Sequence, residues 1–175
     1  MILVRHTTPL VEKGICYGQT NLALADSFPS EAAAVQQQLL GPFSHIFTSP
    51  LLRCLSLAQY LHKCWPQAAP PVQVPALMEL NFGNWENQPW NSLPQPESDH
   101  WMADFVNRSP PGGESFQSLY ERCVGWYKAV CTSYPQALVV THAGVMRCLL
   151  SHLHHTPLHQ AFELYPLQYG QVVVL

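Results

Sequence analysis

Arginine and histidine recur at three places in this sequence, each soon after a short apolar run. Arg5 and His6 follow the apolar N-terminal residues, and Arg53 comes four residues after Ser49. His142 follows another apolar run. A planar guanidinium suits bidentate recognition of phosphate oxygens, and a neutral imidazole is a competent nucleophile towards phosphorus. These residue types therefore indicate phosphoryl binding, with phosphoryl transfer through a histidine as the reaction that they could support.

The roles can be divided among these side chains. His6 is the better candidate for the nucleophile, because it lies directly at the end of a predicted strand beside Arg5. His142 would donate to a phosphoryl oxygen and stabilise developing charge, with Arg5 and Arg53 as phosphate ligands. An alkoxide leaving group needs a proton, and Glu79 is the candidate general acid. Burial among apolar residues would favour its protonated form. Its apolar neighbours in the sequence are Leu77, Leu80, Phe82 and Trp85.

Two other groups of residues have plain structural alternatives. Arg147, one turn into a predicted helix, is equally consistent with a structural role and with a phosphate contact. His152, His154 and His155 could suggest a metal site, but they lie at the polar end of a helix, where histidines commonly contact the last carbonyls. We therefore assign no metal ligands.

Short apolar stretches alternate with helical periods along the chain. Strand-like stretches occupy residues 2–5, 45–49, 72–75, 137–141 and 172–175, and helices are predicted over 30–40, 51–62, 115–134 and 143–154. Ser30 and Glu31 suggest the start of the first helix. This alternation predicts an α/β fold with a mostly parallel sheet and helices on both faces. The carboxyl ends of parallel strands meet at one edge of a sheet, so the Arg and His residues should meet there.

Two regions interrupt the alternation, at residues 6–29 and 81–113. The second is rich in proline and tryptophan and is predicted to contain a short helix near 97–106. We expect this excursion to cover the active site as a lid. No repeat or linker divides the chain, so we expect residues 1–175 to form a single domain.

Composition narrows the classes of function. Of 175 residues, 47% are hydrophobic, which favours one sizeable core, and 11% are charged. The net charge of −3 argues against general electrostatic binding to nucleic acid or to an anionic membrane. No apolar run suits a signal peptide or a membrane span, so a cytoplasmic location is expected. The six cysteines show no C-x-x-C pair, which favours free thiols over a disulfide framework or a zinc site.

Six short motifs run in order through the chain as far as Arg147. They are VRHTTP, GQTNLAL, TSPLLRC, ELNFGNWE, PPGGESF and THAGVMR. They resemble the signatures Arg-His-Gly, Gly-x-x-Asp-x-x-Leu, Ser-x-Leu-x-Arg, Glu-x-x-Phe-Gly-x-Trp-Glu, Gly-Glu-Ser and His-Gly-Gly-x-Ile-Arg of branch one of the histidine phosphatase superfamily. That family includes the cofactor-dependent phosphoglycerate mutases and many small phosphatases.

The resemblance implies a three-layer α/β sandwich of the phosphoglycerate-mutase type. It also implies that His6 is the phosphohistidine nucleophile, that Arg5, Arg53 and His142 bind the phosphoryl group, and that Glu79 is the proton donor. No metal or organic cofactor is implied, and the expected partner is a small phosphorylated metabolite. The oligomeric state is left open.

The sequence departs from the family pattern after the nucleophile. Thr7 stands in place of the usual glycine, and Glu12 in place of an asparagine that commonly assists the phosphate. An ionised carboxylate accepts hydrogen bonds but donates none, so Glu12 should point elsewhere. Thr7 and the loop near Gln19 could compensate, and with Ala143 they are the candidate substrate-loop residues.

Within the family, the RHT variant and the CYGQT loop are most similar to the α-ribazole phosphatase group. That likeness implies hydrolysis of α-ribazole 5′-phosphate. Three alternatives stay open: a broad-specificity sugar or metabolite phosphatase, a mutase-like phosphotransferase, and a non-catalytic phosphate-binding protein. The small number of basic residues favours a phosphatase over a mutase.

Overall fold

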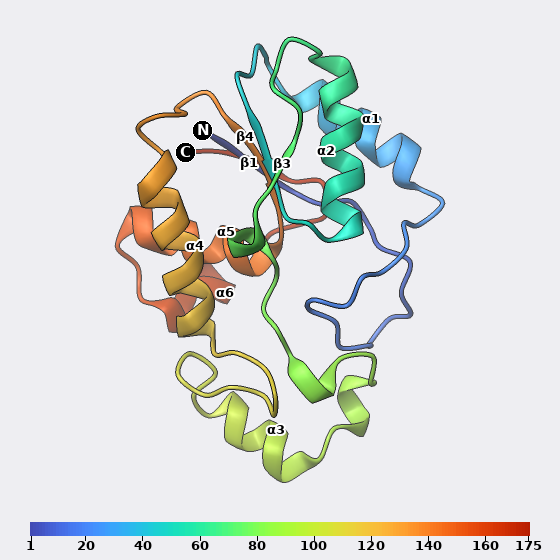
Figure 1. The fold of residues 1–175 in the computed structure, drawn as a ribbon. Coiled ribbons are helices and arrows are strands. Elements are labelled where there is room, and N and C mark those ends of the chain that lie inside the picture. Colours follow the sequence, from blue (N-terminus) through green and yellow to red (C-terminus); the bar gives the residue numbers. More distant parts are fainter.

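The computed structural model describes residues 1–175, and its five strands form one sheet in the order β3-β2-β4-β1-β5 (Figure 1). The strands are β1 (Ile2–Arg5), β2 (Ile46–Thr48), β3 (Val72–Gln73), β4 (Leu138–Thr141) and β5 (Val172–Val174). The first four are parallel to one another, and β5 alone runs antiparallel, beside β1. The predicted mostly parallel α/β sheet is therefore confirmed, with four of the five strands one or two residues shorter than predicted.

Helices cover both faces of this sheet. The helices are α1 (Phe28–Gln38), α2 (Leu52–Cys64), α3 (Gln95–Met102), α4 (Phe116–Val130), α5 (Ala143–His154) and α6 (Ala161–Leu164). Helices α1 and α2 lie on one side of the strands, and α4, α5 and α6 lie on the other, which gives the three layers of the expected sandwich (Figure 1).

Alternation along the strands explains why both faces are covered. Leu3 and Val139 pack into the core beneath α4 and α5, whereas their neighbours Val4 and Val140 pack into the core beneath α1 and α2. All four side chains are completely buried. Successive strand residues point to opposite faces, so an unbroken apolar run requires a helix layer on each side.

Some predicted helix bounds were wrong. Helix α1 begins at Phe28, with Pro29 in its first turn, so Ser30 lies inside the helix and does not cap it. Helix α4 ends at Val130 rather than near residue 134. Its start is as the sequence suggests, because the Ser115 hydroxyl accepts a hydrogen bond from the Ser118 N–H at 3.1 Å. The short helix predicted near 97–106 is α3, which ends at Met102.

The excursion of residues 81–113 lies away from the sheet, at the bottom of the view in Figure 1. It has a small core of its own, in which Cys16, Trp85 and Leu93 are buried against Phe82 and Trp101. Aromatic packing therefore explains the density of tryptophan in this segment. Its movement as a lid stays a prediction, as does the assignment of the whole chain to one domain.

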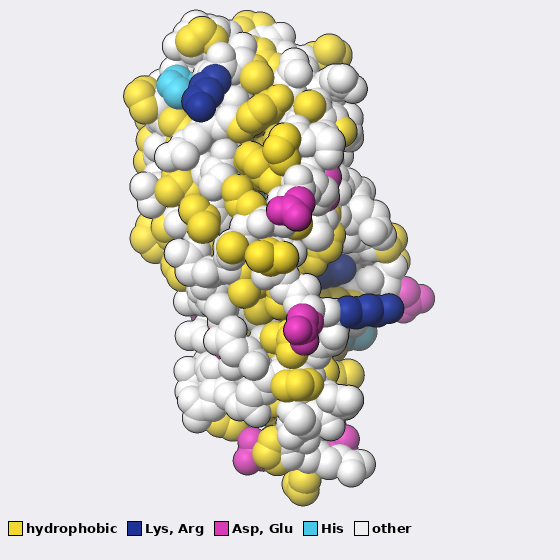
Figure 2. Space-filling view, turned by 90° about the vertical axis from the view of Figure 1, so that its right-hand side faces the viewer, with side chains coloured by type: hydrophobic (Ala, Val, Ile, Leu, Met, Phe, Trp, Pro, Cys, Tyr) yellow, Lys and Arg dark blue, Asp and Glu magenta, His cyan; other side chains and the backbone are white.

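The surface carries few charges. Figure 2 shows a face on which charged side chains lie scattered among hydrophobic and uncharged polar ones. None of the helices combines the length and the apolar composition needed to cross a membrane. All six cysteines are free, as expected.

Candidate active site

The strand ends bring the predicted site residues together. The His6 N–H donates to the carbonyl of Thr141 at 3.0 Å, and the Ser49 N–H donates to the carbonyl of Val140 at 3.0 Å. The residues that follow β1, β2 and β4 are therefore neighbours at one edge of the sheet. The rings of His6 and His142 meet there edge to face, with their centroids 5.0 Å apart.

The tautomer of His6 is set by the main-chain carbonyl of the next residue, Thr7. Its Nδ1 lies 2.7 Å from the carbonyl oxygen of Thr7. A carbonyl can only accept, so Nδ1 carries the proton and Nε2 keeps its lone pair in the neutral ring. The ring is 2% exposed, and this burial, with the positive charge of Arg53, holds the pKa of His6 well below its usual value. Neutral His6 is thus set up with Nε2 as a free base.

His142 lies at the N-cap of α5 and is completely buried. Its Nε2 is 2.8 Å from the hydroxyl of Ser49. Burial, followed by the charge of Arg53, lowers the pKa of His142 well below its usual value. Ser49 was not predicted as a site residue, although its position directly after β2 was a signal that could have found it.

The two predicted phosphate-binding arginines contact no carboxylate. Arg53 is completely buried, and its guanidinium donates to the carbonyls of Thr20 (2.8 Å) and Gly18 (2.5 Å). Arg5 donates to the carbonyl of Leu167 at 2.7 Å. The Nε atoms of both arginines are buried without a partner. A buried cation without a counter-ion is costly, so the arrangement favours an anionic ligand.

Two tyrosines lie over these arginines. The ring of Tyr169 stacks on the guanidinium of Arg5 at 4.0 Å, and that of Tyr17 lies 5.5 Å from the guanidinium of Arg53. The two hydroxyls are hydrogen-bonded to each other. Burial raises the pKa of the Tyr17 phenol. No pattern in the sequence pointed to Tyr169, which reaches the site because antiparallel β5 starts where β1 ends.

Glu79 reaches the site from the segment that follows β3 and its short 3-10 turn (Pro75–Leu77). Its two carboxylate oxygens accept hydrogen bonds from the N–H groups of Leu80 (2.9 Å) and Gly144 (3.1 Å). A Cβ atom at Gly144 would collide with the Glu79 carboxylate, so only glycine allows this approach. The sequence predicted apolar neighbours for Glu79 but not these two donors, which fix the direction of its carboxylate.

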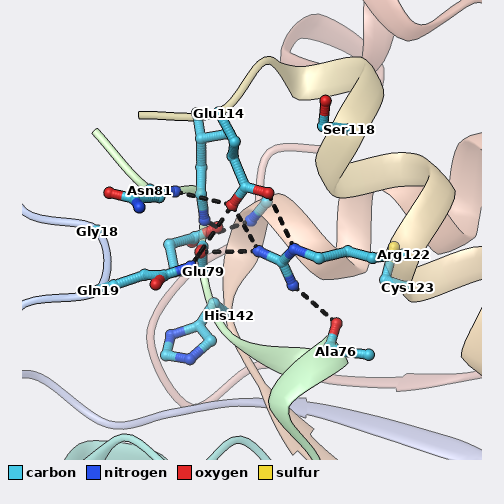
Figure 3. A network of polar contacts seen from close by, with 12 residues as sticks. Gly18, Gln19, Ala76, Glu79, Asn81, Glu114, Ser118, Arg122, Cys123 and His142 are labelled. Atoms are coloured by element: carbon cyan, nitrogen blue, oxygen red, sulfur yellow. Dashed lines mark hydrogen bonds and ion pairs between the residues drawn. The ribbon is translucent and has the colours of Figure 1, made fainter. Parts of the chain in front are cut away.

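A polar network holds the main chain around Glu79 (Figure 3). Arg122 donates to the carbonyl of Glu79 (2.9 Å) and to the carbonyl of Ala76 (2.8 Å), and it forms a bidentate ion pair with Glu114. Gln19 donates to the same Glu79 carbonyl at 3.0 Å. The side chain of Gln19 thus supports Glu79.

A pocket of about 180 Å³ opens beside these residues. It is lined by Arg5, His6, Tyr17, Glu79, Leu80, Phe82, Phe116, Ala143, Gly144, Arg147 and Phe162. Of the candidate substrate-loop residues, Ala143 lines the pocket, whereas Thr7 and Gln19 do not. Thr7 is completely buried, and its hydroxyl has no hydrogen-bond partner. Arg53 and His142 are completely buried and are not among the lining residues, and Glu12 is exposed.

The histidines at the end of α5 have local contacts. The ring of His152 is hydrogen-bonded to the hydroxyl of Tyr120 at 3.0 Å, and His154 stacks on Tyr165. No group of three or more His, Cys, Asp or Glu side chains is arranged to hold a metal ion.

Comparison with known proteins found curated relatives that match most of the chain. The curated "Adenosylcobalamin/alpha-ribazole phosphatase" of Salmonella typhimurium is 26% identical over 151 residues, which are 83% of this chain and 67% of that protein. The "Probable phosphoglycerate mutase GpmB" of Yersinia pestis is 31% identical over 166 residues, 90% of this chain and 75% of that protein. The chain thus spans about two thirds to three quarters of the length of these relatives.

Solved structures share the fold. The alpha-ribazole phosphatase of Shigella flexneri superposes with a TM-score of 0.87 at 24% identity, covering 98% of this chain and 87% of that one. The phosphoglycerate mutase of Thermus thermophilus gives a TM-score of 0.73 at 28% identity, covering 98% of this chain and 90% of that one.

The family model described as histidine phosphatase superfamily (branch 1) matches residues 1–175. This match, together with the relatives, supports a phosphatase function. The chain belongs to branch 1 of the histidine phosphatase superfamily.

Proposed function

We propose that this protein is a phosphomonoesterase that works through a phosphohistidine at His6. The observation that carries the proposal is the hydrogen bond from His6 Nδ1 to the carbonyl of Thr7, which leaves Nε2 unprotonated. Arg5 and Arg53, which contact no carboxylate, supply the positive charge for the phosphate.

In the first step, His6 Nε2 attacks phosphorus and the P–O bond to the leaving group breaks. The leaving oxygen takes a proton from Glu79, so the products are an alcohol, a phosphohistidine and the Glu79 carboxylate. His142, which reaches the same edge of the sheet, donates to a phosphoryl oxygen as negative charge develops there.

In the second step, water attacks the phosphohistidine. The Glu79 carboxylate takes a proton from that water, and the N–P bond breaks to return neutral His6 and inorganic phosphate. Glu79 thus acts first as acid and then as base, and the catalyst is restored after each turnover. The two N–H donors from Leu80 and Gly144 keep its carboxylate in one place through both steps.

We propose α-ribazole 5′-phosphate as the substrate, giving α-ribazole and phosphate. The names of the relatives from Salmonella typhimurium and Escherichia coli, at 26% and 29% identity, support this assignment. We also propose a cytoplasmic location, which the free cysteines favour because thiols stay reduced there.

A mutase is the second candidate. The Yersinia pestis relative named as a phosphoglycerate mutase is 31% identical, which is the specific observation in its favour. A mutase would return the phosphoryl group from His6 to another hydroxyl of the substrate instead of to water. A phosphatase would therefore release inorganic phosphate from 3-phosphoglycerate, whereas a mutase would move the phosphoryl group without releasing it.

The test is phosphate release by the purified protein in EDTA. The panel contains α-ribazole 5′-phosphate, 3-phosphoglycerate, sugar phosphates, a phosphopeptide and p-nitrophenyl phosphate. Preference for the first supports the proposal. Similar rates across the small phosphates would leave a broad phosphatase, and exchange without release would favour the mutase. No reaction with any of these compounds would favour a non-catalytic phosphate-binding protein.

The nucleophile is tested by replacing His6 with Asn. The variant should lose turnover and any acid-labile ³²P label on the protein while keeping its fold. Exposed His100 provides the matched control, because His100→Asn removes an imidazole that does not line the catalytic pocket. Label retained in the His6→Asn variant would overturn the phosphohistidine assignment.

A further inference from the structure

We propose that the leaving group of the substrate lies in an apolar groove between α3 and α6, and that the protein therefore favours phosphate esters of uncharged alcohols that carry a flat ring system. This inference rests on the proposed phosphatase function and extends the same site. It concerns the part of the substrate that stays behind when phosphate is removed.

The groove has a volume of about 360 Å³ and lies beside the catalytic pocket. It is lined by Trp101, Met102, Phe105, His159, Phe162 and Glu163. Small-molecule sites usually enclose about 300–1,000 Å³. The catalytic pocket, at about 180 Å³, is smaller than that range, so it suits a phosphate with a short connection. The groove provides the remaining space that a larger substrate needs.

Phe162 lies at the boundary between the groove and the pocket, because it lines both. Its ring centroid lies 5.4 Å from that of Phe105 in the groove and 5.3 Å from that of Phe116 in the pocket. These three rings therefore form one aromatic cluster between the pocket of Glu79 and the residues that follow α3, with Phe116 buried and Phe162 exposed. Phe162 is 47% exposed and Met102 is 62% exposed, so this surface is open to a ligand.

Arg147 lies at the junction. Its guanidinium stacks on the ring of Phe162 at 4.4 Å, and its Nε donates to the carbonyl of Tyr165 at 3.2 Å. The guanidinium also lines the pocket, and its terminal N–H groups have no partner in the protein. It can therefore donate to a hydroxyl or ring oxygen that connects the phosphate to the ring system.

The charges of the groove favour an uncharged occupant. Glu163 is its one acidic residue, and no Lys or Arg lines it. An anionic leaving group would meet a carboxylate without a compensating cation, whereas a flat ring can stack on Phe105 and Phe162. A sugar phosphate without such a ring would leave the apolar surface in water. The continuity through Phe162 is the reason to assign the groove to the substrate rather than to a second protein.

The test compares two esters with the same leaving hydroxyl, ribose 5-phosphate and a benzimidazole ribonucleoside 5′-phosphate. We expect kcat/KM to be at least about tenfold higher for the second, because filling apolar surface of this size discriminates by that order. The Met102→Glu variant should lose most of this preference. Its control is Leu164→Glu, which adds the same charge at an exposed position of α6 outside the groove.

Binding of the unphosphorylated benzimidazole ribonucleoside, measured by calorimetry, reports on the groove without catalysis. Binding that is lost in Met102→Glu and kept in Leu164→Glu supports the proposal even if no ester is hydrolysed, in which case the proposed phosphatase function alone fails. Equal turnover of both esters, or no binding of the nucleoside, would overturn the groove assignment while leaving the phosphatase intact. A dimer that Met102→Glu dissociates would also overturn it, because the groove would then be an interface between copies.

Discussion

The ion pair between Arg122 and Glu114 holds the main chain that carries Glu79, so replacing Arg122 with Met should damage catalysis through Glu79 (Figure 3). Arg122 donates to the carbonyl of Glu79 at 2.9 Å and to the carbonyl of Ala76 at 2.8 Å. Without it, that segment keeps the bond from Gln19 to Glu79 but loses its link to α4. The carboxylate of Glu79 should then move away from the leaving group.

The magnitude follows from burial and geometry. Removing one partner of a buried ion pair costs about 3–5 kcal/mol. The side chains of Arg122 and Glu114 are 24% and 19% exposed, so partial solvent screening reduces the expected loss of stability to about 2 kcal/mol. A displacement of about 1 Å at a reacting group can lower the rate about 100-fold. We therefore expect kcat/KM to fall 10- to 100-fold, which corresponds to an activation free energy that is higher by about 1.4–2.8 kcal/mol.

The assay compares kcat/KM on an alkyl phosphate and on p-nitrophenyl phosphate, whose leaving group needs little help from an acid. The fall in kcat/KM should be larger for the alkyl ester, because a general acid matters most for a poor leaving group. Lys128→Met is the control, since it removes an exposed cation from the same helix. Unchanged hydrolysis of the alkyl ester by a folded but destabilised Arg122→Met variant would refute the positioning role.

Two further outcomes follow from the site. Gly144→Ala should lower kcat at least about tenfold, because the added Cβ would collide with the Glu79 carboxylate. The circular dichroism spectrum should stay unchanged, and a normal kcat would show that Glu79 is not used in this position. Stability should fall as the pH drops below about 6.5, where the unfolded chain protonates His6 and His142 but the native state, with both pKa values lowered, does not. Each histidine should contribute about 1.4 kcal/mol in total between pH 7.5 and 5.5, measured by urea unfolding, and an equal loss of stability in His142→Asn over that range would contradict this.

The sequence was sufficient to place site residues where a local pattern and the sheet topology lead to the same position. Buried parallel strands show as short apolar runs, and the residue after each run must lie at the carboxyl edge of the sheet. For this reason His6 and His142, which follow β1 and β4, could be placed together without a structure. Arg53 could be placed there as well, because it lies in the first turn of the helix that follows β2.

Contacts made by distant, irregular segments could not be predicted in the same way. Tyr169 reaches Arg5 because the loop before β5 returns to the end of β1, which requires knowing that β5 is antiparallel. Glu114 and Arg122 support Glu79 from another part of the chain, and no periodic pattern links them. Gln19 was expected to face the substrate, but its amide lies against the carbonyl of Glu79.

Binding of the phosphate and readiness of the nucleophile depend on the same charges in the proposed reaction. The positive charges of Arg53 and Arg5 help burial to keep His6 unprotonated, and they have the same effect on His142. A phosphate dianion between them offsets that charge, so protonation of His142 becomes easier at the moment when a donor to the phosphoryl oxygen is useful. His6, by contrast, must already be unprotonated at Nε2 when the ester binds, because a protonated imidazole cannot attack phosphorus. Two arginines without carboxylate partners serve both needs, whereas an arginine paired with a carboxylate would attract the phosphate less and leave His6 easier to protonate.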